Sequence, residues 1–353
     1  MNKKTKTIFS KIWNITIQIL FKFRFLWPRI AVAMITLSLS IFLIFLLIRS
    51  IPGNIIDDFA IKLVEQRRIT MAEARILAVQ ILGYNPDESP FIQFASYISN
   101  LFHGNLGRSM SNPLLSVNDV IRKNLPWTLF VSTISLVISF LIGSFLGSNA
   151  IWKKSKVFRT SVTGYTVLSS SMPDFILGIL LLYVFSYVFK IFPTQNAYNL
   201  YFSTPGFNFK FFIDCIYHAA LPIISYSLIQ TGNWALMMRG SCISVLGDDY
   251  IYAAKARGIP SNIIASKYLR RNALLPLITS LAISFAALFG GSPLMENIFN
   301  YPGIGQQFAM AIGQKEYFMI VGILFFTSSL IIFVNLIADS IYSIVDPRVR
   351  RNV

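Results

Sequence analysis

Apolar residues occur along the chain in long, charge-poor runs that alternate with more polar stretches. An α-helix needs roughly 20 residues to cross the hydrocarbon core of a bilayer, and each run is long enough. Buried helices of soluble proteins rarely give several runs of this kind. The pattern predicts an all-α integral membrane protein with six transmembrane helices, at residues 30–48, 124–152, 159–190, 215–238, 272–295 and 317–338.

The polar segment between the first two runs, residues 49–123, predicts a small helical unit outside the membrane. Thr70 and Glu73 have the spacing of a capping box, and the periodic run that follows stops at Gly83. A second helix is expected over residues 91–102, before a glycine-rich turn at 104–108. The unit is either a lid over a pore or a surface that receives another protein.

The segment ahead of the first run, residues 1–29, is basic and amphipathic. Polar residues recur in it at helical spacing, at Lys11, Asn14, Gln18 and Lys22. This pattern is typical of a helix that lies in the headgroup region of a membrane. A poorly ordered basic tail is the alternative, and in both cases the segment is expected to act as an anchor.

The polar loop at residues 239–271 predicts a short, well-terminated helix. Acidic residues occupy its first turn and basic residues its last, so both complement the helix dipole. Gly258 is expected to end it in a left-handed conformation, and Pro260 prevents its continuation. A second helix should start at Ser261 and return to the membrane. Small side chains should leave a flat surface that another protein can approach, at Ala253, Ala254 and Ala256.

Composition supports a membrane protein, and charge orients it. Hydrophobic residues make up 54% of the chain, charged residues 13%, and the mean hydropathy is +0.60. Most of the excess positive charge lies in residues 1–29, 153–159 and 239–271. By the positive-inside rule, both termini and the 239–271 loop face the cytoplasm. The net charge of +16 therefore reflects topology, and no nucleic acid partner is expected.

Residue types that support catalysis or metal binding are sparse. Cys215 and Cys242 fall near opposite membrane faces and are not expected to pair. With two histidines and no Cys/His cluster, no metal site is expected. The chain lacks the Gly-x-x-x-x-Gly-Lys-Ser/Thr phosphate loop, so ATP binding by that route is excluded. No cleavable signal peptide is evident, because the first run ends in Arg49-Ser50-Ile51-Pro52-Gly53.

Polar residues inside the runs are candidates for a translocation path. Asp174 is the only charge well inside a run, and intramembrane acids usually face a water-filled path or a partner charge. Alternatively, Pro173 breaks the run and leaves Asp174 near a surface or as a local helix cap. Gln230 and Asn233 are weaker candidates, because polar residues also hold transmembrane helices together.

Glycine and proline interrupt the end of the fifth run. Gly290-Gly291-Ser292-Pro293 predicts either a break near an external gate or close packing of helices. Glu296 and Tyr301-Pro302-Gly303 follow it outside the membrane. They are candidates for a re-entrant segment, which is tolerated only where protein buries it.

The 239–271 loop resembles the EAA loop of ABC-importer permeases, which docks on the ATPase subunit. Tyr252 stands where the family has Glu, whereas the positions that fit are Ala253, Ala254, Gly258 and Pro276. The start at Asp249-Tyr250 and the end at Lys255-Ala256-Arg257-Gly258 look like the peptide/nickel subclass. The alternative is any basic cytosolic loop between two helices.

The resemblance runs in order from Arg49 to Arg350 and is specific to the "B" partner of dipeptide/oligopeptide/nickel permeases. The matching motifs lie at residues 47–53, 103–109, 171–175, 192–194, 296–305 and from Asn335-Leu336 to Asp346-Pro347-Arg348. Asn54 and Asn105 stand where the family has acids, a departure that concerns fine substrate contacts.

The resemblance implies a type I ABC-importer permease fold and a permease subunit for peptide uptake in a bacterial plasma (inner) membrane. Implied partners are a homologous second permease, two ABC ATPase subunits, an extracytoplasmic binding protein and membrane lipid. ATP and Mg would be used by the ATPases, so this chain is expected to hold no cofactor and not to be an enzyme. The implied ATPase-coupling residues are Asp249, Tyr250, Ala253, Ala254, Ala256, Arg257 and Gly258.

Import of nickel or a metal chelate is the alternative within the same architecture, because the same motifs serve both. A stand-alone secondary transporter would usually carry several intramembrane acids or histidines, and a membrane hydrolase would need a nucleophile with a base or a metal cluster. The expected organisation is a leader (1–29), a first span (30–48), an external unit (49–123), a five-helix permease domain (124–338) and a cytosolic tail (339–353).

Overall fold

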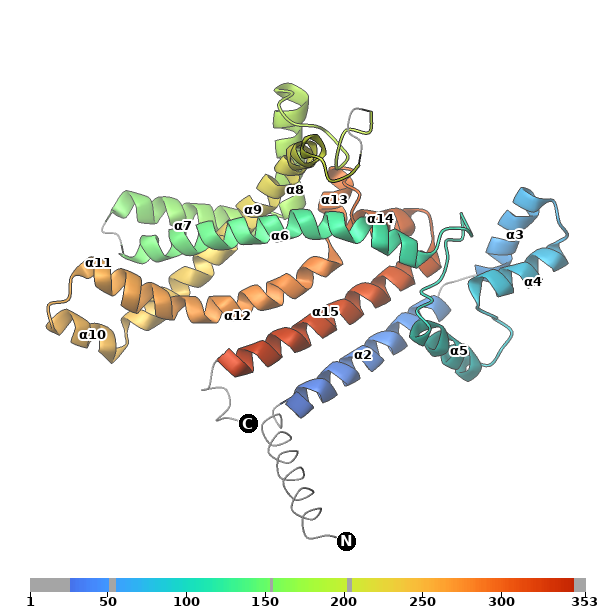
Figure 1. The fold of residues 1–353 in the computed structure, drawn as a ribbon, viewed down its shortest axis with the longest axis horizontal. Coiled ribbons are helices and arrows are strands. Elements are labelled where there is room, and N and C mark those ends of the chain that lie inside the picture. Colours follow the sequence, from blue (N-terminus) through green and yellow to red (C-terminus); the bar gives the residue numbers. More distant parts are fainter. Residues whose placement is uncertain (1–25, 51–54, 153–154, 202–204, 346–353) are drawn as a thin grey trace, which may run out of the picture.

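The computed structural model describes residues 26–50, 55–152, 155–201 and 205–345, and the elements in these ranges are helices. Figure 1 shows a bundle of long helices with a small helical unit at one end and a short helical loop at the other. The predicted leader up to residue 25, and the predicted tail from residue 346 onward, lie outside the described residues.

Among the described residues, five helices are long and apolar enough to cross a membrane, which confirms five of the predicted runs. The helix that contains the second run starts earlier than predicted, because the Ser116 hydroxyl accepts the N–H of Asp119 at 3.1 Å and caps it. The spans lie on α2 (Leu26–Arg49), α6 (Val117–Trp152), α9 (Phe209–Leu246), the segment Ser261–Gly290 that contains α12 (Arg271–Ala287), and α15 (Tyr317–Val345).

The remaining run, 159–190, is bent. It consists of α7 (Lys156–Ser171) followed by α8 (Asp174–Leu182) and η1 (Tyr183–Val188), with an angle of 100° between the two parts. Proline has no N–H and disfavours a helical conformation at the preceding residue, so α7 ends before Pro173. The run is therefore not one straight helix but a broken span or a re-entrant loop, and the alternative of a break at Pro173 is confirmed.

Small residues bring α6 and α9, the most extensive helix pair of the described bundle, into close contact. A Cβ added at Gly147 would lie 2.3 Å from the carbonyl oxygen of Ala235. The Ser135 hydroxyl lies 3.4 Å from the carbonyl oxygen of Ile223 across the same interface. The two backbones therefore touch at a place where only glycine fits.

Replacing Gly147 with alanine is expected to destabilise the bundle by about 1–3 kcal/mol, because the added methyl group forces α6 and α9 apart. Gly240→Ala is the matched control, since no heavy atom lies within 4 Å of a Cβ there. Thermal unfolding of the purified variants in detergent measures the difference. Equal melting temperatures for the two variants would contradict the close helix crossing.

The external unit contains α3 (Ile55–Arg67), α4 (Met71–Leu82) and α5 (Pro90–Phe102). The predicted capping box is confirmed: the Thr70 hydroxyl accepts the N–H of Glu73 at 3.4 Å, and the Glu73 carboxylate accepts the N–H of Thr70 at 3.1 Å. The stop at Gly83 and the second helix are also confirmed, whereas α3 was not predicted. Phe59 and Leu63 of α3 are fully buried, so the unit has its own core.

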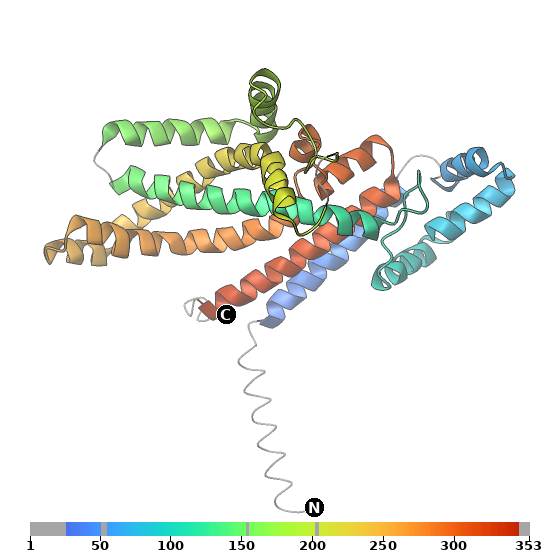
Figure 2. The same cartoon turned by 45° about the horizontal axis from the view of Figure 1, so that its top comes forward.

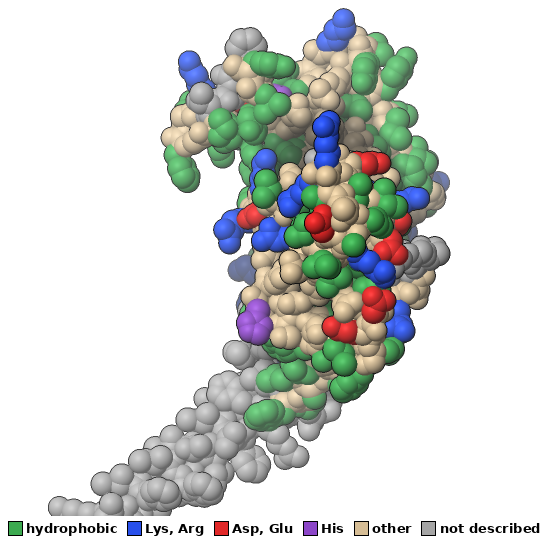
Figure 3. Space-filling view, turned by 90° about the vertical axis from the view of Figure 1, so that its right-hand side faces the viewer, with side chains coloured by type: hydrophobic (Ala, Val, Ile, Leu, Met, Phe, Trp, Pro, Cys, Tyr) green, Lys and Arg blue, Asp and Glu red, His purple; other side chains and the backbone are tan. Residues whose placement is uncertain are grey.

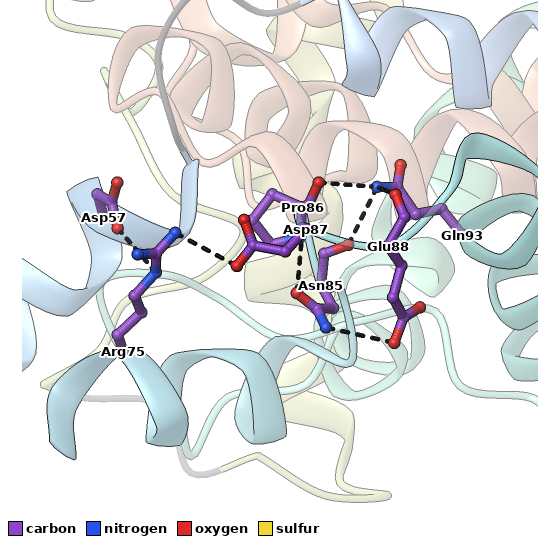
Figure 4. Close-up of polar contacts among 7 residues, drawn as sticks. All are labelled: Asp57, Arg75, Asn85, Pro86, Asp87, Glu88 and Gln93. Carbon is purple, nitrogen blue, oxygen red and sulfur yellow. Dashed lines mark hydrogen bonds and ion pairs between the residues drawn. The ribbon is translucent and has the colours of Figure 1, made fainter. Parts of the chain in front are cut away.

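Two polar side chains hold the external unit together, as Figure 4 shows. Arg75 of α4 lies between Asp57 and Asp87, with nitrogen–oxygen distances of 3.3 and 3.5 Å. The buried Gln93 amide donates to three backbone carbonyl groups of the α4–α5 loop, those of Asn85, Pro86 and Glu88. The Arg49 guanidinium at the end of α2 donates to the side-chain amide oxygen of Gln93 at 3.1 Å, which fixes the unit to the first span.

Candidate functional site

The short helix α10 (Asp249–Ala256) lies at the end of the bundle opposite the external unit (Figures 1 and 2). Gly258 has a φ of 72°, which confirms the predicted left-handed termination. Its N–H donates to the Lys255 carbonyl group at 3.0 Å, and the N–H of Ile259 donates to that of Ala254 at 3.2 Å. This pair of bonds is the Schellman motif, so α10 has a well-defined end.

One face of α10 is fixed to the bundle. Ile251 and Ala254, one helical turn apart, are buried against Ile264. Trp152 at the end of α6 and Leu246 at the end of α9 pack around the same cluster. Ala254 therefore does not belong to the flat exposed surface that the sequence predicts, because it points toward the bundle.

The opposite face of α10 is exposed. Tyr252 is 59% exposed, and the Lys255 ammonium lies 5.6 Å from the centre of its ring. Partial burial raises the pKa of Tyr250, and the Asp248 carboxylate raises it further. The remaining predicted coupling residues on this surface are Asp249, Ala253, Ala256, Arg257 and Gly258. An aromatic ring among small and basic groups suits protein docking, and docking itself stays a prediction.

A continuous helical segment connects α10 to the membrane. It comprises α11 (Ser261–Ile263), the π-helical η2 (Ile264–Arg270) and α12. The Arg270 guanidinium donates to the Asn149 side chain of α6 at 2.8 Å, and the Ser241 hydroxyl of α9 donates to the Ala273 carbonyl group at 2.7 Å. These contacts connect the segment that follows α10 to both α6 and α9.

A polar chamber of about 210 Å³ lies between α6, α9 and α12. Its polar lining comes from hydroxyl, phenol and amide groups, and its apolar lining from the middle of α6 and from the end of α12 and the residues that follow it. None of the lining side chains is charged; they are Ser132, Ser135, Leu136, Tyr226, Gln230, Ser284, Ala287, Leu288 and Gly291.

The three residues predicted for a translocation path have different positions. Gln230 lines the chamber. Asn233 lies on the exposed side of α9, where its side-chain oxygen is 3.4 Å from the Ser170 hydroxyl of α7, a contact between helices. Asp174 starts α8 after the break, and its carboxylate accepts the N–H of Phe175 at 2.8 Å. The N-cap position of α8 is Pro173 and has no side-chain cap, so Asp174 belongs to the first turn of the helix, and its role in a translocation path stays a prediction.

The chamber serines of α6, Ser132 and Ser135, were not among the predicted site residues. Ser132, Ser135 and Ser139 share one face of α6 at helical spacing, a signal that is present but also typical of close helix packing. Tyr226 and Ser284 carry no local signal, because only the packing of α9 and α12 brings them to the chamber.

Beyond the chamber, the chain turns back in a hairpin of short helices. After η3 (Leu288–Gly290) the helix breaks at Gly291, as one of the two alternatives predicts, and α13 (Pro293–Ile298) and α14 (Ile304–Gly313) follow. The run predicted to extend to residue 295 therefore ends earlier. Glu296 is only 6% exposed, and this burial raises the pKa of its carboxyl group. Hydrogen bonds from the Gln306 N–H and the Thr128 hydroxyl lower the pKa, but by less than burial raises it.

A second buried carboxylate anchors the turn that follows the external helices. Glu316 accepts the N–H groups of Met110 and Ser111 at 2.6 and 2.7 Å. These bonds fix the 103–111 segment to the start of α15. Glu316 was not predicted as a structural anchor, because Met110 lies 206 residues earlier in the chain and no local pattern connects the two.

The end of the molecule that carries the external unit presents apolar, acidic and basic side chains together (Figure 3). Phe91 and Phe102 of α5 are 81% and 85% exposed, and Ile76 of α4 is 62% exposed. Exposed apolar side chains on a unit outside the bundle indicate a surface available to a partner.

Comparison with known proteins gives consistent matches. The family model described as binding-protein-dependent transport system inner membrane component matches residues 139–351. A putative peptide transport system permease protein of Brucella abortus is 30% identical over 91% of this chain and 97% of its own length. Dipeptide transport system permease protein DppB of Bacillus subtilis is 28% identical over 92% and 96%.

A further relative and one solved structure extend these matches. Oligopeptide transport system permease protein AppB of Bacillus subtilis is 29% identical over 75% of this chain and 82% of its own length. An inward-facing structure of the MetNI methionine ABC transporter has a TM-score of 0.50 at 18% identity, with 64% of this chain and 96% of that chain covered. At this identity the likeness concerns the fold, and it confirms the predicted type I importer architecture.

Proposed function

The chain belongs to the family of binding-protein-dependent transport system inner membrane components, and we propose that it is the permease subunit of an ATP-driven importer of peptides. The names of its relatives, which are peptide, dipeptide and oligopeptide permeases, support peptides as the cargo.

The uncharged polar chamber is the observation that carries the choice of cargo. Its hydroxyl, phenol and amide groups offer donors and acceptors that suit the main-chain amides of a peptide. Nickel or another transition metal would favour imidazole, thiolate or carboxylate ligands, and the lining residues include none of these. A wall of this kind accommodates peptides with different side chains, because it contacts what all peptides share.

The proposed machine contains further subunits. Two ABC ATPase subunits would bind ATP and Mg. One would receive the exposed face of α10, and the other would receive the equivalent helix of the second permease. A homologous second permease would complete the pathway, and an extracytoplasmic binding protein would deliver peptide to the external unit. This chain would hold no cofactor and catalyse no reaction. Both termini would face the cytoplasm of a bacterial plasma membrane, as the distribution of Lys and Arg supports.

The proposed mechanism follows from the connection between α10 and α12. Closure of the ATPases on ATP would displace α10 as a rigid body, because its buried face and its Schellman termination leave little freedom within it. The segment 261–290 would carry that displacement to the chamber and change which side of the membrane the chamber opens to.

Partner dependence tests this proposal. In proteoliposomes that contain the full complex, labelled peptide should accumulate only with ATP on the ATPase side and binding protein on the other. Vesicles that contain the two permeases without the ATPases should show background uptake. Uptake by the permeases alone, driven by an ion gradient, would contradict the proposal and favour a secondary transporter.

A further inference from the structure

Glu296 is a buried carboxylate whose partners are a hydroxyl group and backbone amides. It is 6% exposed, and within the described part of the chain it takes part in no salt bridge. Oε1 accepts a hydrogen bond from the Thr128 hydroxyl of α6 at 2.9 Å, and Oε2 accepts one from the Gln306 N–H of α14 at 3.0 Å. A single side chain on α13 thus joins two other helices.

The same two side chains accept hydrogen bonds from backbone N–H groups in the first turn of α14. The first N–H groups of a helix have no partner within it, and Gly303, at the N-cap position, has no side chain to supply one. The Thr128 hydroxyl accepts the N–H of Ile304 at 2.8 Å while donating to Glu296. Thr128 and Glu296 therefore cap α14 from outside, and the negative charge lies at the positive end of its dipole.

Glycines enclose the carboxylate so tightly that no other residue fits. A Cβ at Gly303 would lie 2.2 Å from Oε2 of Glu296, and one at Gly305 would lie 3.0 Å from the same atom. A Cβ at Gly291 would lie 2.9 Å from Oε1. Gly291 also lines the polar chamber, so the carboxylate lies directly behind one wall of the chamber.

The segment that leaves α10 ends at this point. Residues 261–290 form one candidate membrane span from the cytosolic loop to the residue before Gly291. In Figures 1 and 2, α13 and α14 lie toward the external unit and away from α10. A displacement of α10 would therefore act on one end of this span, and the contacts of Glu296 hold the other.

We propose that Glu296, Thr128 and the Ile304 and Gln306 amides form a latch that keeps the external side of the chamber closed. In the resting protein the latch ties the α13–α14 hairpin to α6. Opening toward the outside requires the hairpin to separate from α6, and the displacement of α10 supplies the work. This inference rests on the proposed function for its direction of transport, whereas the closed chamber can be tested without it.

Site-directed labelling tests whether the latch closes the chamber. Ser132→Cys places a thiol on the chamber wall, in a background where the buried Cys215 and Cys242 are replaced by alanine. The full complex is placed in right-side-out vesicles without ATP, and a membrane-impermeant maleimide is added outside. With the latch intact the thiol should stay unlabelled. Labelling of this parent protein would overturn the proposal, because the chamber would already be open.

Two variants then release the latch. Thr128→Val keeps the shape of the side chain and removes the hydroxyl, and Glu296→Gln keeps the shape and removes the charge. Loss of one hydrogen bond to a charged group should raise the labelling rate about tenfold. Thr128→Ser is the matched control, since it retains the hydroxyl group, and it should label as slowly as the parent.

Melting curves of the detergent-purified complexes separate a released latch from an unfolded chain. If Thr128→Val and Glu296→Gln stay folded and unlabelled, or if Thr128→Ser labels as fast as they do, the latch is wrong. Peptide uptake measured in parallel keeps the two proposals apart. Uptake that depends on the ATPases while labelling stays unchanged would reject the latch and leave the importer function standing.

Discussion

Replacing Gly258 with valine is expected to reduce peptide uptake to background while leaving the chain inserted in the membrane. Gly258 has a φ of 72°, which costs a residue with a side chain about 1–2 kcal/mol and is worst for a β-branched one. To avoid that strain the backbone at residue 258 must leave the left-handed region, and this change breaks the two hydrogen bonds that end α10. The exposed face of α10 would then lose its fixed orientation.

The control for this prediction is Gly258→Asn. Asparagine adopts left-handed conformations more readily than other residues with a side chain, and no heavy atom lies within 4 Å of the added Cβ. This variant should keep most of the uptake. The measurements are peptide uptake and peptide-stimulated ATP hydrolysis by the complete complex. Normal uptake by Gly258→Val would contradict the assignment of α10 as the ATPase-coupling helix.

Replacing Ser284 with tryptophan should block transport by filling the chamber. Ser284 of α12 lines a space of 210 Å³, and an indole ring there would contact the opposite wall formed by α6 and α9. Peptide uptake is expected to fall to background, because the ring would occupy the proposed path of the cargo. The complex should still assemble, since the added ring enters existing space and displaces little of the packed core.

The adjacent Ile283 provides the control for Ser284→Trp. It is 55% exposed on the outer side of the same helix, so Ile283→Trp adds the same ring away from the chamber. Uptake by this variant should remain close to that of the unmodified protein. Equal uptake by both tryptophan variants would show that the chamber is not part of the transport path.

Local signals in the sequence predicted the ends of elements well. Gly258 and the Thr70–Glu73 capping box act within one helical turn, so their residue types alone determine the geometry that the structure contains. The sequence left a break at Pro173 open beside a single span, because apolar residues continue on both sides of the proline. Helix α3 lacked a clear signal, since its apolar face becomes evident only when α4 packs on it.

The candidate sites were less accessible from the sequence because tertiary packing creates them. Thr128 and Glu296 are 168 residues apart in sequence, and no pattern in either segment reveals that they meet. The charged Asp174 attracted attention, whereas the chamber is lined by uncharged groups that resemble ordinary packing residues. Ala254 was expected at the surface, but the position of α10 against η2 turns it inward.

Uptake in a strain that lacks this chain is the most direct test of the central claim. Labelled dipeptide, labelled pentapeptide and labelled nickel are supplied separately, with and without the restored chain, and its presence in the membrane is verified. The account predicts that the restored chain returns peptide uptake and leaves nickel uptake unchanged. Restoration of nickel uptake alone would contradict it and would assign the same machine to a metal.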